Sequence, residues 1–183
     1  MRYIIVDLEA TCWEGRSNTD RMEIIEIGAV ILESSHGPVV EEFSAFVKPV
    51  IEPMLSDYCK RLTSISQADI DKADDFKTVF PRFIDWIGAQ PFTLCSWGNY
   101  DLKQFRVDCE RHNIPLPESF LRHINLKQEF ANLKRIKPCG MAKALNILDI
   151  KLEGTHHRGI DDARNIAKIA VRILPIVENK GIS

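Results

Sequence analysis

The chain has 183 residues, of which 45% are hydrophobic and 27% are charged, and its formal net charge is −2. This is the composition of an ordinary globular protein, so collagen-like, disordered and coiled-coil chains are excluded. A slightly negative charge also argues against a protein that coats nucleic acid non-specifically. The length suits one hydrophobic core, and we expect a single domain over residues 1–183.

The longest unbroken apolar runs, at residues 3–6 and 29–32, contain four residues each. A membrane-spanning helix needs about 20. We therefore expect no membrane partner, and the N-terminal residues lack the pattern of a signal peptide. The five cysteines are odd in number and widely spaced, without a Cys-x-x-Cys pair. This usage indicates reduced thiols and a cytoplasmic location.

Three strands rich in β-branched and aromatic residues are predicted first, at residues 2–7, 23–32 and 39–47. The turn-forming segment 34–38 (SSHGP) joins the second and third strands as a hairpin. Later elements are predicted as helices at 55–62 and 76–87, a strand at 92–95, a helix at 102–112, a strand at 120–126, and helices at 129–133, 141–148 and 161–177. This order predicts an α/β fold in which helices flank a mixed sheet.

Two acidic residues, Asp7 and Glu9, stand at the end of the first predicted strand. Residues i and i+2 of an extended chain point to the same face, so both carboxylates are expected to project together. Two like charges this close repel each other and lose hydration unless one is protonated or a cation lies between them. The alternative is that the strand has ended and both acids are solvated, since motifs this short often occur by chance.

Three later residues fit the same chemistry. Asp101 lies at the start of a predicted helix after the fourth strand, where ligands bind in open α/β sheets. Asp162 lies near the start of the final helix, and His157 precedes it in a glycine-flanked loop. Taken singly, each acid has a commoner role as an acid at a helix N-terminus, and the histidine is more often exposed. Together with Asp7 and Glu9 they form a set of four acids and one histidine at the ends of secondary-structure elements.

This set predicts two-metal phosphoryl chemistry. Carboxylate oxygens suit Mg²⁺ or Mn²⁺, and two such ions about 4 Å apart can hold the attacking and the leaving oxygen of an in-line displacement. A neutral histidine beside them can accept the proton of the attacking water. Without the four acids the net charge changes from −2 to +2. A metal-loaded site would therefore present a neutral or weakly positive surface to a phosphodiester.

Four segments resemble the DEDDh branch of the DEDD (DnaQ-like) 3′→5′ exonuclease superfamily, and within it the ERI-1-like three-prime RNA exonuclease or histone mRNA exonuclease subfamily. They are residues 7–12 (DLEATC), 58–67 (YCKRLTSISQ), 95–101 (CSWGNYD) and 157–165 (HRGIDDARN). The resemblance implies a ribonuclease-H-like fold of five strands in the order 3-2-1-4-5, with strand 2 antiparallel to the others. The tyrosine-bearing branch of the superfamily would need Tyr at the position of Arg158.

The resemblance also implies a role for each residue of the set. Four acids would bind two metal ions: Asp7, Glu9, Asp101 and Asp162. Asp7 would bridge the two ions, while Asp101 would act mostly through metal-bound water and the other two would ligate the first ion. His157 would be the general base. Because His156 and Asp161 stand beside the matched positions, an assignment shifted by one residue is the main alternative.

Residues near the matched segments are expected to hold the 3′-terminal nucleotide. They are Glu9, Ala10, Thr11, Tyr58, Leu62, Thr63, Ile65 and His157. By the resemblance, Ala10 and Thr11 would contact the sugar, where the 2′-hydroxyl separates RNA from DNA. Leu62, Thr63 and Ile65 would line the base pocket.

Aromatic and basic residues offer further contacts with a nucleic acid. Tyr58 or Trp97 could stack on a base, although Trp97 is equally well explained as a core aromatic residue. Short basic clusters at residues 60–61 and 134–137 could contact phosphates. A solvated face explains either cluster as well.

The sequence thus predicts a metal-dependent 3′→5′ exoribonuclease that releases nucleoside 5′-monophosphates. No accessory nucleic-acid-binding domain is recognised, so single-stranded or short RNA 3′ ends are the expected substrates. One alternative is the same chemistry on DNA or on very short oligonucleotides, although the motif DLEATC favours RNA. The other is a catalytically idle nucleic-acid-binding module on this fold. The sequence does not predict the oligomeric state.

Overall fold

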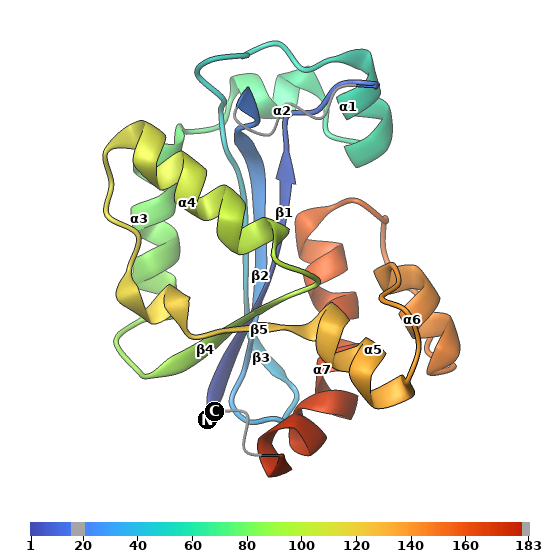
Figure 1. Cartoon of the computed structure of the whole chain (residues 1–183). Helices are drawn as coiled ribbons and strands as arrows, with labels where there is room; N and C mark the ends of the chain where they lie inside the picture. The colour runs from blue at the N-terminus through green and yellow to red at the C-terminus, as the bar shows by residue number, and fades with distance from the viewer. Residues whose placement is uncertain (16–20, 181–183) are drawn as a thin grey trace.

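A five-stranded mixed sheet forms the centre of the computed structural model, which describes residues 1–15 and 21–180 (Figure 1). The strands lie in the order β3-β2-β1-β4-β5. Strand β2 is antiparallel to both of its neighbours, whereas β1, β4 and β5 are parallel. The bounds are β1 Arg2–Ala10, β2 Ile24–Leu32, β3 Val39–Phe46, β4 Phe92–Ser96 and β5 His123–Asn125. The expected strand order and orientation are confirmed.

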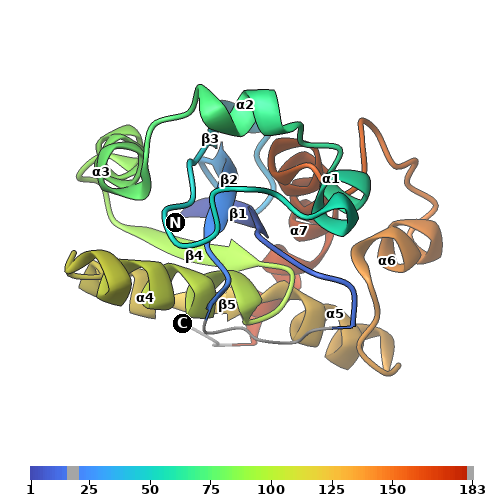
Figure 2. The same ribbon diagram turned by 90° about the horizontal axis from the view of Figure 1, so that it is seen from above.

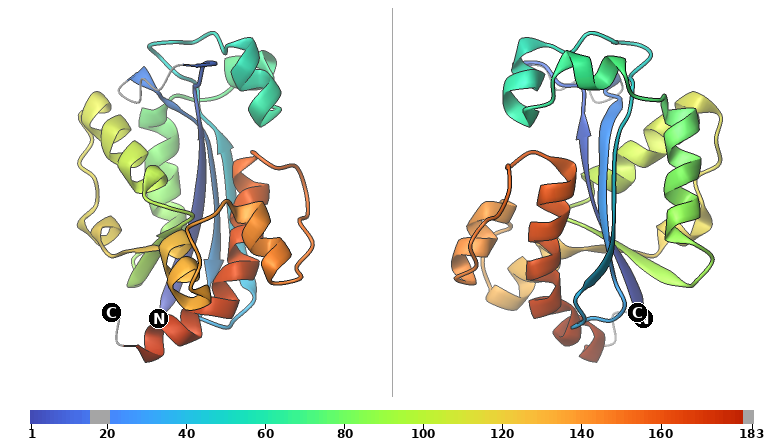
Figure 3. Two further views of the ribbon diagram at one scale, coloured as in Figure 1. Left: turned by 45° about the vertical axis from the view of Figure 1, so that its right-hand side comes forward. Right: turned by 180° about the vertical axis from the view of Figure 1, so that it is seen from behind.

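Helices cover both faces of the sheet and one of its ends. Their bounds are α1 Asp57–Thr63, α2 Gln67–Asp71, α3 Phe76–Ile87, α4 Tyr100–His112, α5 Leu126–Lys134, α6 Met141–Ile147 and α7 Gly159–Asn179, with a 3-10 helix η2 at Glu118–Leu121. Helices α3 and α4 pack on one face, and α5, α6 and α7 pack on the other (Figure 3). Helices α1 and α2 lie at the end of the sheet toward which β1 runs (Figure 2). No helix within the described ranges has the length and apolarity that crossing a bilayer requires.

The sheet is buried on both faces because its central strands are apolar on both sides. Every residue of β2 is buried. On the face covered by α3 and α4, the aromatic rings of Phe83 and Phe105 stack with their centroids 5.7 Å apart. On the other face, Ile166 and Ile173 of α7 are almost completely buried. Burial of each such side chain contributes about 1.5–3 kcal/mol, so both helical layers are held firmly on the sheet.

Strand β1 is longer than the sequence prediction. It runs to Ala10, so Asp7 and Glu9 lie within the strand and not at its end. Pairing with β2 continues through both acids, which stand opposite Gly28 and Glu26 respectively. The two acids are therefore fixed by strand pairing, and the alternative of solvated acids beyond a strand end is wrong.

Two short elements also differ from the prediction. The fifth strand is shorter than residues 120–126, because Phe120 belongs to η2 and packs into the aromatic core while Leu126 begins α5. Asn125 caps α5 by accepting the N–H of Gln128 at 3.0 Å. Helix α2 was not predicted, because five residues are too few to display a helical period. The other helices begin and end within three residues of the predicted bounds.

A close backbone contact fixes the start of α7 on the sheet. Gly28 of β2 faces Gly159, the first residue of α7, and a Cβ atom at Gly28 would lie 2.0 Å from the carbonyl carbon of Gly159. Only glycine allows the two backbones to approach this closely. The first turn of α7 therefore lies directly on the strands that carry the acidic residues.

Candidate active site

A cavity of about 370 Å³ lies where β1 and β4 approach their carboxyl ends. The two strands are parallel, so the residues that follow them meet at one edge of the sheet, as ligand sites of open α/β sheets do. The residues that line the cavity are Asp7, Leu8, Glu9, Trp97, Tyr100, Asp101, Gly140, Met141, Ala142, His156, His157 and Asp162. The four acids and the histidine predicted from the sequence are all among them.

Three carboxylates converge in this cavity. Asp7, Glu9 and Asp162 each offer one oxygen atom, and these oxygens lie within 4.8 Å of one another. The first two residues belong to β1, and Asp162 lies in the first turn of α7. The structure confirms that the two acids of β1 share a face, and it brings the acid near the far end of the chain beside them.

Asp101 occupies a different position in the cavity wall. It is the second residue of α4, only 4% exposed, and its Oδ1 accepts the N–H of Leu8 at 3.0 Å. It lies outside the group of three converging carboxylates found among the described residues. Asp101 thus braces β1 between Asp7 and Glu9, while its expected action through metal-bound water stays a prediction.

Burial and mutual repulsion raise the pKa values of these acids. Burial, and then the charges of Asp162 and Glu26, raise the pKa of Glu9 to about 8. Burial, and then the charges of Asp101 and Glu9, raise the pKa of Asp7 well above its usual range. Burial also raises the pKa of Asp101 to about 6, although its backbone hydrogen bond opposes this change. The fully ionised cluster is therefore unfavourable by itself, and a cation between the carboxylates would stabilise it.

The donor set fits hard divalent cations. Such ions prefer carboxylate oxygens, and Asp7, Glu9 and Asp162 supply them within one small group. A divalent ion between the three acids would also offset the repulsion that raises their pKa values. The chemistry of the donors and the electrostatics of the cavity thus agree.

Two adjacent histidines lie beside Asp162. The backbone N–H of His157 donates to Oδ2 of Asp162 at 3.0 Å, and Nδ1 of the His156 ring lies 3.0 Å from the same oxygen. The two imidazole rings stack with their centroids 4.0 Å apart. Burial, and then the neighbouring His156, lower the pKa of His157. A lowered pKa favours the neutral imidazole that a general base needs.

Several residues expected to hold the nucleotide are engaged in local structure. The Thr11 hydroxyl oxygen accepts the N–H of Glu23 at 3.0 Å. The Thr63 hydroxyl donates to the carbonyl of Cys59 at 2.9 Å and accepts the N–H of Ile65 at 3.2 Å. Ile65 is 1% exposed and packs beneath α1. These three side chains are bonded or packed within the protein, and none of them lines the cavity.

Of the eight residues predicted to bind substrate, Glu9 and His157 line the cavity. Ala10 is buried at the end of β1, and Tyr58 and Leu62 are half-buried on α1. Their contacts with a nucleotide stay predictions, as do those of the other three.

Part of the cavity wall was not predicted as part of the site. Tyr100 contributes to the wall and stands within the matched segment 95–101, but it was given no role. The segment 140–142 also contributes and carries no motif of charged residues. Trp97 lines the cavity and also packs on Phe130 at a ring distance of 5.9 Å, as expected of a core aromatic residue, while its stacking on a base stays a prediction. Its Nε1 donates to the carbonyl of Cys139 at 3.0 Å, which fixes the indole in the wall.

Comparison with known proteins agrees with this geometry. The sequence model of the family described as Exonuclease (RNase_T) matches residues 4–170. The chain belongs to this exonuclease family. The matched residues include the three converging carboxylates, Asp101 and His157. The exonuclease resemblance inferred from the sequence motifs is confirmed.

Similar members of the exonuclease family include curated and solved proteins. Human 3′-5′ exoribonuclease 1 is 33% identical over 93% of this chain and 51% of its own length. Human ERI1 exoribonuclease 2 is 32% identical over 93% of this chain and 28% of its own length. The solved nuclease domain of 3′hExo, a DEDDh family member bound to rAMP, superposes with a TM-score of 0.89 at 32% identity and covers 96% of this chain and 92% of that domain.

These similarities define the chain as a DEDDh exonuclease domain with a ribonuclease-H-like fold. The chain spans about half or less of the length of these two curated relatives. DEDDh exonucleases depend on divalent metal ions, and the cluster of Asp7, Glu9 and Asp162 provides the ligands that such ions require.

Proposed function

We propose that this protein is a 3′→5′ exoribonuclease that uses two Mg²⁺ or Mn²⁺ ions and releases nucleoside 5′-monophosphates. The observation that carries the proposal is the convergence of Asp7, Glu9 and Asp162 in one cavity with His157. Similar proteins that align with 93% of the chain are also named exoribonucleases.

Each residue has a task in this reaction. Asp7, Glu9 and Asp162 would hold the ions, which supply Lewis-acid polarisation and neutralise developing charge on the phosphate. His157 accepts the proton of the attacking water, and its lowered pKa keeps the imidazole neutral for this task. Asp101 holds the backbone of β1 through Leu8, so the carboxylates on either side keep their orientation.

RNA 3′ ends are the proposed substrate. The similar nuclease domain of 3′hExo is bound to rAMP, which corresponds in type to the mononucleotide product proposed here. DNA and very short oligonucleotides are the competing substrates, because the same chemistry would cleave their phosphodiesters. We also propose one exonuclease domain over residues 1–183 and a cytoplasmic location. The five cysteines, all free thiols, support a reducing compartment.

The test compares matched single-stranded RNA, matched DNA and dinucleotide substrates in Mg²⁺, in Mn²⁺ and in EDTA, with mass analysis of the products. The proposal expects nucleoside 5′-monophosphates released from the RNA 3′ end, and no product in EDTA. Asp7→Ala and Asp162→Asn should abolish cleavage while the variants remain folded. Equal cleavage in EDTA would contradict the metal mechanism, and faster cleavage of DNA would change the substrate class.

An idle binding module is the remaining alternative. It would bind labelled RNA without turnover in saturating Mn²⁺. The intact acidic cluster argues against it. Buried acids that repel one another destabilise the fold, and a module that only binds RNA has no need of them.

A further inference from the structure

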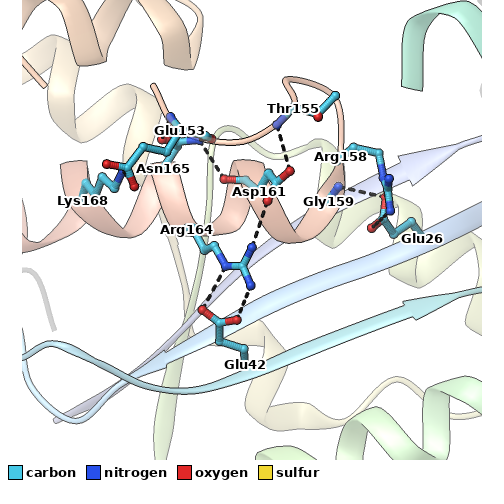
Figure 4. Close-up of polar contacts among 10 residues, drawn as sticks. All are labelled: Glu26, Glu42, Glu153, Thr155, Arg158, Gly159, Asp161, Arg164, Asn165 and Lys168. Carbon is cyan, nitrogen blue, oxygen red and sulfur yellow. Dashed lines mark hydrogen bonds and ion pairs between the residues drawn. The ribbon is translucent and has the colours of Figure 1, made fainter. Parts of the chain in front are cut away.

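The segment that carries both histidines is held by side chains at every second residue. We call residues 153–159 the histidine loop. Four of its backbone N–H groups donate to side-chain oxygens: Glu153 to Asn165 at 3.1 Å, Thr155 to Asp161 at 2.8 Å, His157 to Asp162 at 3.0 Å and Gly159 to Glu26 at 3.0 Å. Figure 4 shows three of these contacts around the first turns of α7. Three of the four acceptors therefore come from α7, and the fourth comes from β2.

The middle of the loop is bonded by two acceptors of α7, Asp161 and Asp162. Of these two, Asp161 is outside the metal cluster. Its Oδ2 receives the N–H of Thr155, and its Oδ1 receives Nη1 of Arg164 at 2.9 Å. Arg164 also pairs with Glu42 on β3 (Figure 4). A Cβ atom at Gly154, where φ is +77°, would lie 2.4 Å from the carboxyl carbon of Asp161. The Asp161 carboxylate thus lies inside the bend of the loop and determines its shape.

Both ends of the histidine loop are fixed independently. At the first end, the fully buried Asn165 accepts the N–H of Glu153 and donates to its carbonyl at 2.7 Å. At the other end, the fully buried Glu26 accepts Nε of Arg158 at 3.1 Å together with the N–H of Gly159. Between these ends, the backbone N–H of His157 donates to Asp162, which belongs to the metal cluster, and the N–H of Thr155 donates to Asp161, which does not.

His157 itself adopts a backbone conformation that needs support. Its φ is +63°, in the left-handed region that is unfavourable for a residue with a Cβ atom. Such conformations persist where the surrounding structure determines them, and they are frequent at functional sites. Loss of a bond within the loop should therefore let His157 relax away from its orientation toward the cavity.

We propose that Asp161 is a positioning residue for His157, because its carboxylate holds the bend of the histidine loop from inside. This inference rests on the proposed function, in which His157 is the general base. Asp161 touches neither substrate nor metal in this arrangement and acts through the backbone of Thr155. The aspartate adjacent to the metal ligand thus has a separate task.

The test compares three variants by steady-state kinetics on single-stranded RNA at saturating metal. Asp161→Ala removes the acceptor for Thr155 and should lower kcat about tenfold to a hundredfold, below the full contribution of a general base, while KM stays unchanged. Asp161→Asn keeps an acceptor oxygen and should recover most of the activity. Glu42→Gln, the control, weakens the Arg164 pair without touching the loop, and should retain wild-type kcat.

Two further measurements separate this inference from the proposed function. Amide hydrogen exchange at Thr155 and His157 should quicken in Asp161→Ala and not in Glu42→Gln, whether or not RNA is cleaved. Mn²⁺ binding should be equal in Asp161→Ala and wild type. If exchange quickens in Asp161→Ala while the wild-type protein does not cleave RNA, the proposed function is overturned and the role of Asp161 in holding the histidine loop is kept. If Asp161→Ala does not fold, Gly154→Ala is used, since its methyl group displaces the same carboxylate.

Unchanged kcat and unchanged exchange in a folded Asp161→Ala protein would overturn the inference. Equal losses in Asp161→Ala and Asp161→Asn would overturn it as well, because the shared feature would then be the lost charge and not the hydrogen bond. A rise in KM with constant kcat would indicate a role in substrate binding and would also contradict positioning of the base.

Discussion

Glu9 and Glu26 stand directly opposite each other on the antiparallel strands β1 and β2, and they differ in how their charges are compensated. Glu26 pairs with Arg158 and accepts the N–H of Gly159. No ion pair to Glu9 is found among the described residues, and Glu9 faces the carboxylates of Asp7 and Asp162 instead. Like charges across a strand pair are destabilising. The uncompensated negative charge of this region therefore lies in the cavity, where a metal ion would be held.

The acidic cluster should lower the stability of the metal-free protein. Asp7→Asn removes one charge from the cluster and should raise the free energy of unfolding in EDTA by about 1 kcal/mol, as the removal of function-related strain often does. Wild type should gain about 2.7 kcal/mol when the metal is at a hundred times its Kd. Asp7→Asn should gain much less. Denaturation in EDTA and in Mn²⁺ measures both effects.

The control for this prediction is Asp149→Asn, which makes the same chemical change at an exposed position outside the cavity. It should respond to Mn²⁺ as wild type does. A metal-dependent stabilisation of Asp7→Asn as large as that of wild type would mean that the three converging carboxylates do not bind the ion.

The two histidines should contribute unequally to the reaction. The His156 ring is bonded to Asp162 through Nδ1, whereas His157 contacts Asp162 through its backbone N–H. The His157 ring stacks on His156, and no hydrogen bond to this ring is found among the described residues. His157→Ala should therefore lower kcat about 10²–10⁴-fold, the usual contribution of a general base, and His156→Ala should lower it about tenfold or less. Both are measured on RNA at saturating metal. A larger loss of kcat in His156→Ala than in His157→Ala would mean that His156 is the general base.

The site could be predicted from the sequence where its geometry is local. The alternation of a strand is enough to bring Asp7 and Glu9 to one face. The arrival of Asp162 beside them depends on the close contact of Gly28 with Gly159, which spacing along the chain does not reveal. The pattern of residues placed Asp162 in the set of four acids, and the resemblance to DEDDh exonucleases implied which ion it would ligate.

The prediction failed where tertiary packing decides the structure. The strand predicted at residues 120–126 begins at Phe120, but this residue lies in η2 and completes a cluster of rings around Phe83. The hydroxyl of Thr63, which is expected to line the base pocket, bonds the backbone at the end of α1, and its contact with a nucleotide stays a prediction. The residue type of Phe120 fits a strand or a packed turn equally well, so its partners had to be seen in the structure.

The basic cluster at 134–137 should contact the RNA backbone more than the cluster at 60–61 does. Lys60 pairs with Asp57 at 2.7 Å, and Arg61 lies 4.0 Å from Glu14. The basic residues of 134–137 are exposed, form no ion pair within the described ranges, and precede the wall segment 140–142. Their charges are therefore available to phosphates.

Removing two of these charges should weaken the salt dependence of RNA binding. Each phosphate contact with a single strand contributes about 0.7 to the slope of log K against log salt concentration. The double variant Lys134→Ala, Lys137→Ala should therefore lose up to about 1.4 of that slope for a long RNA and change little for a dinucleotide. Lys77→Ala on α3 is the exposed control. An unchanged slope would mean that the basic cluster is a solvated surface that does not contact the RNA.

A hydrogen bond between the first strand and the last helix should make stability depend on pH. The Tyr3 hydroxyl and the Ser35 hydroxyl both donate to the carboxylate of Glu178. These two bonds, Ser35 first, lower the pKa of Glu178 below its ordinary value of 4.5. A lowered carboxyl pKa gives stability that is present above the unfolded value and is lost as the pH falls through the folded value.

Tyr3→Phe should therefore cost about 1 kcal/mol at neutral pH, near the value for an ordinary hydrogen bond because Glu178 is exposed. The coupling between Tyr3→Phe and Glu178→Gln in a double-mutant cycle isolates this bond from the packing of the ring. Urea denaturation measures the coupling at neutral pH and at successively lower pH values, down to the acid range in which Glu178 becomes protonated. The coupling should shrink at the lower pH because the charged acceptor is lost. A coupling that stays constant over this range would mean that Glu178 is not the charged partner of Tyr3.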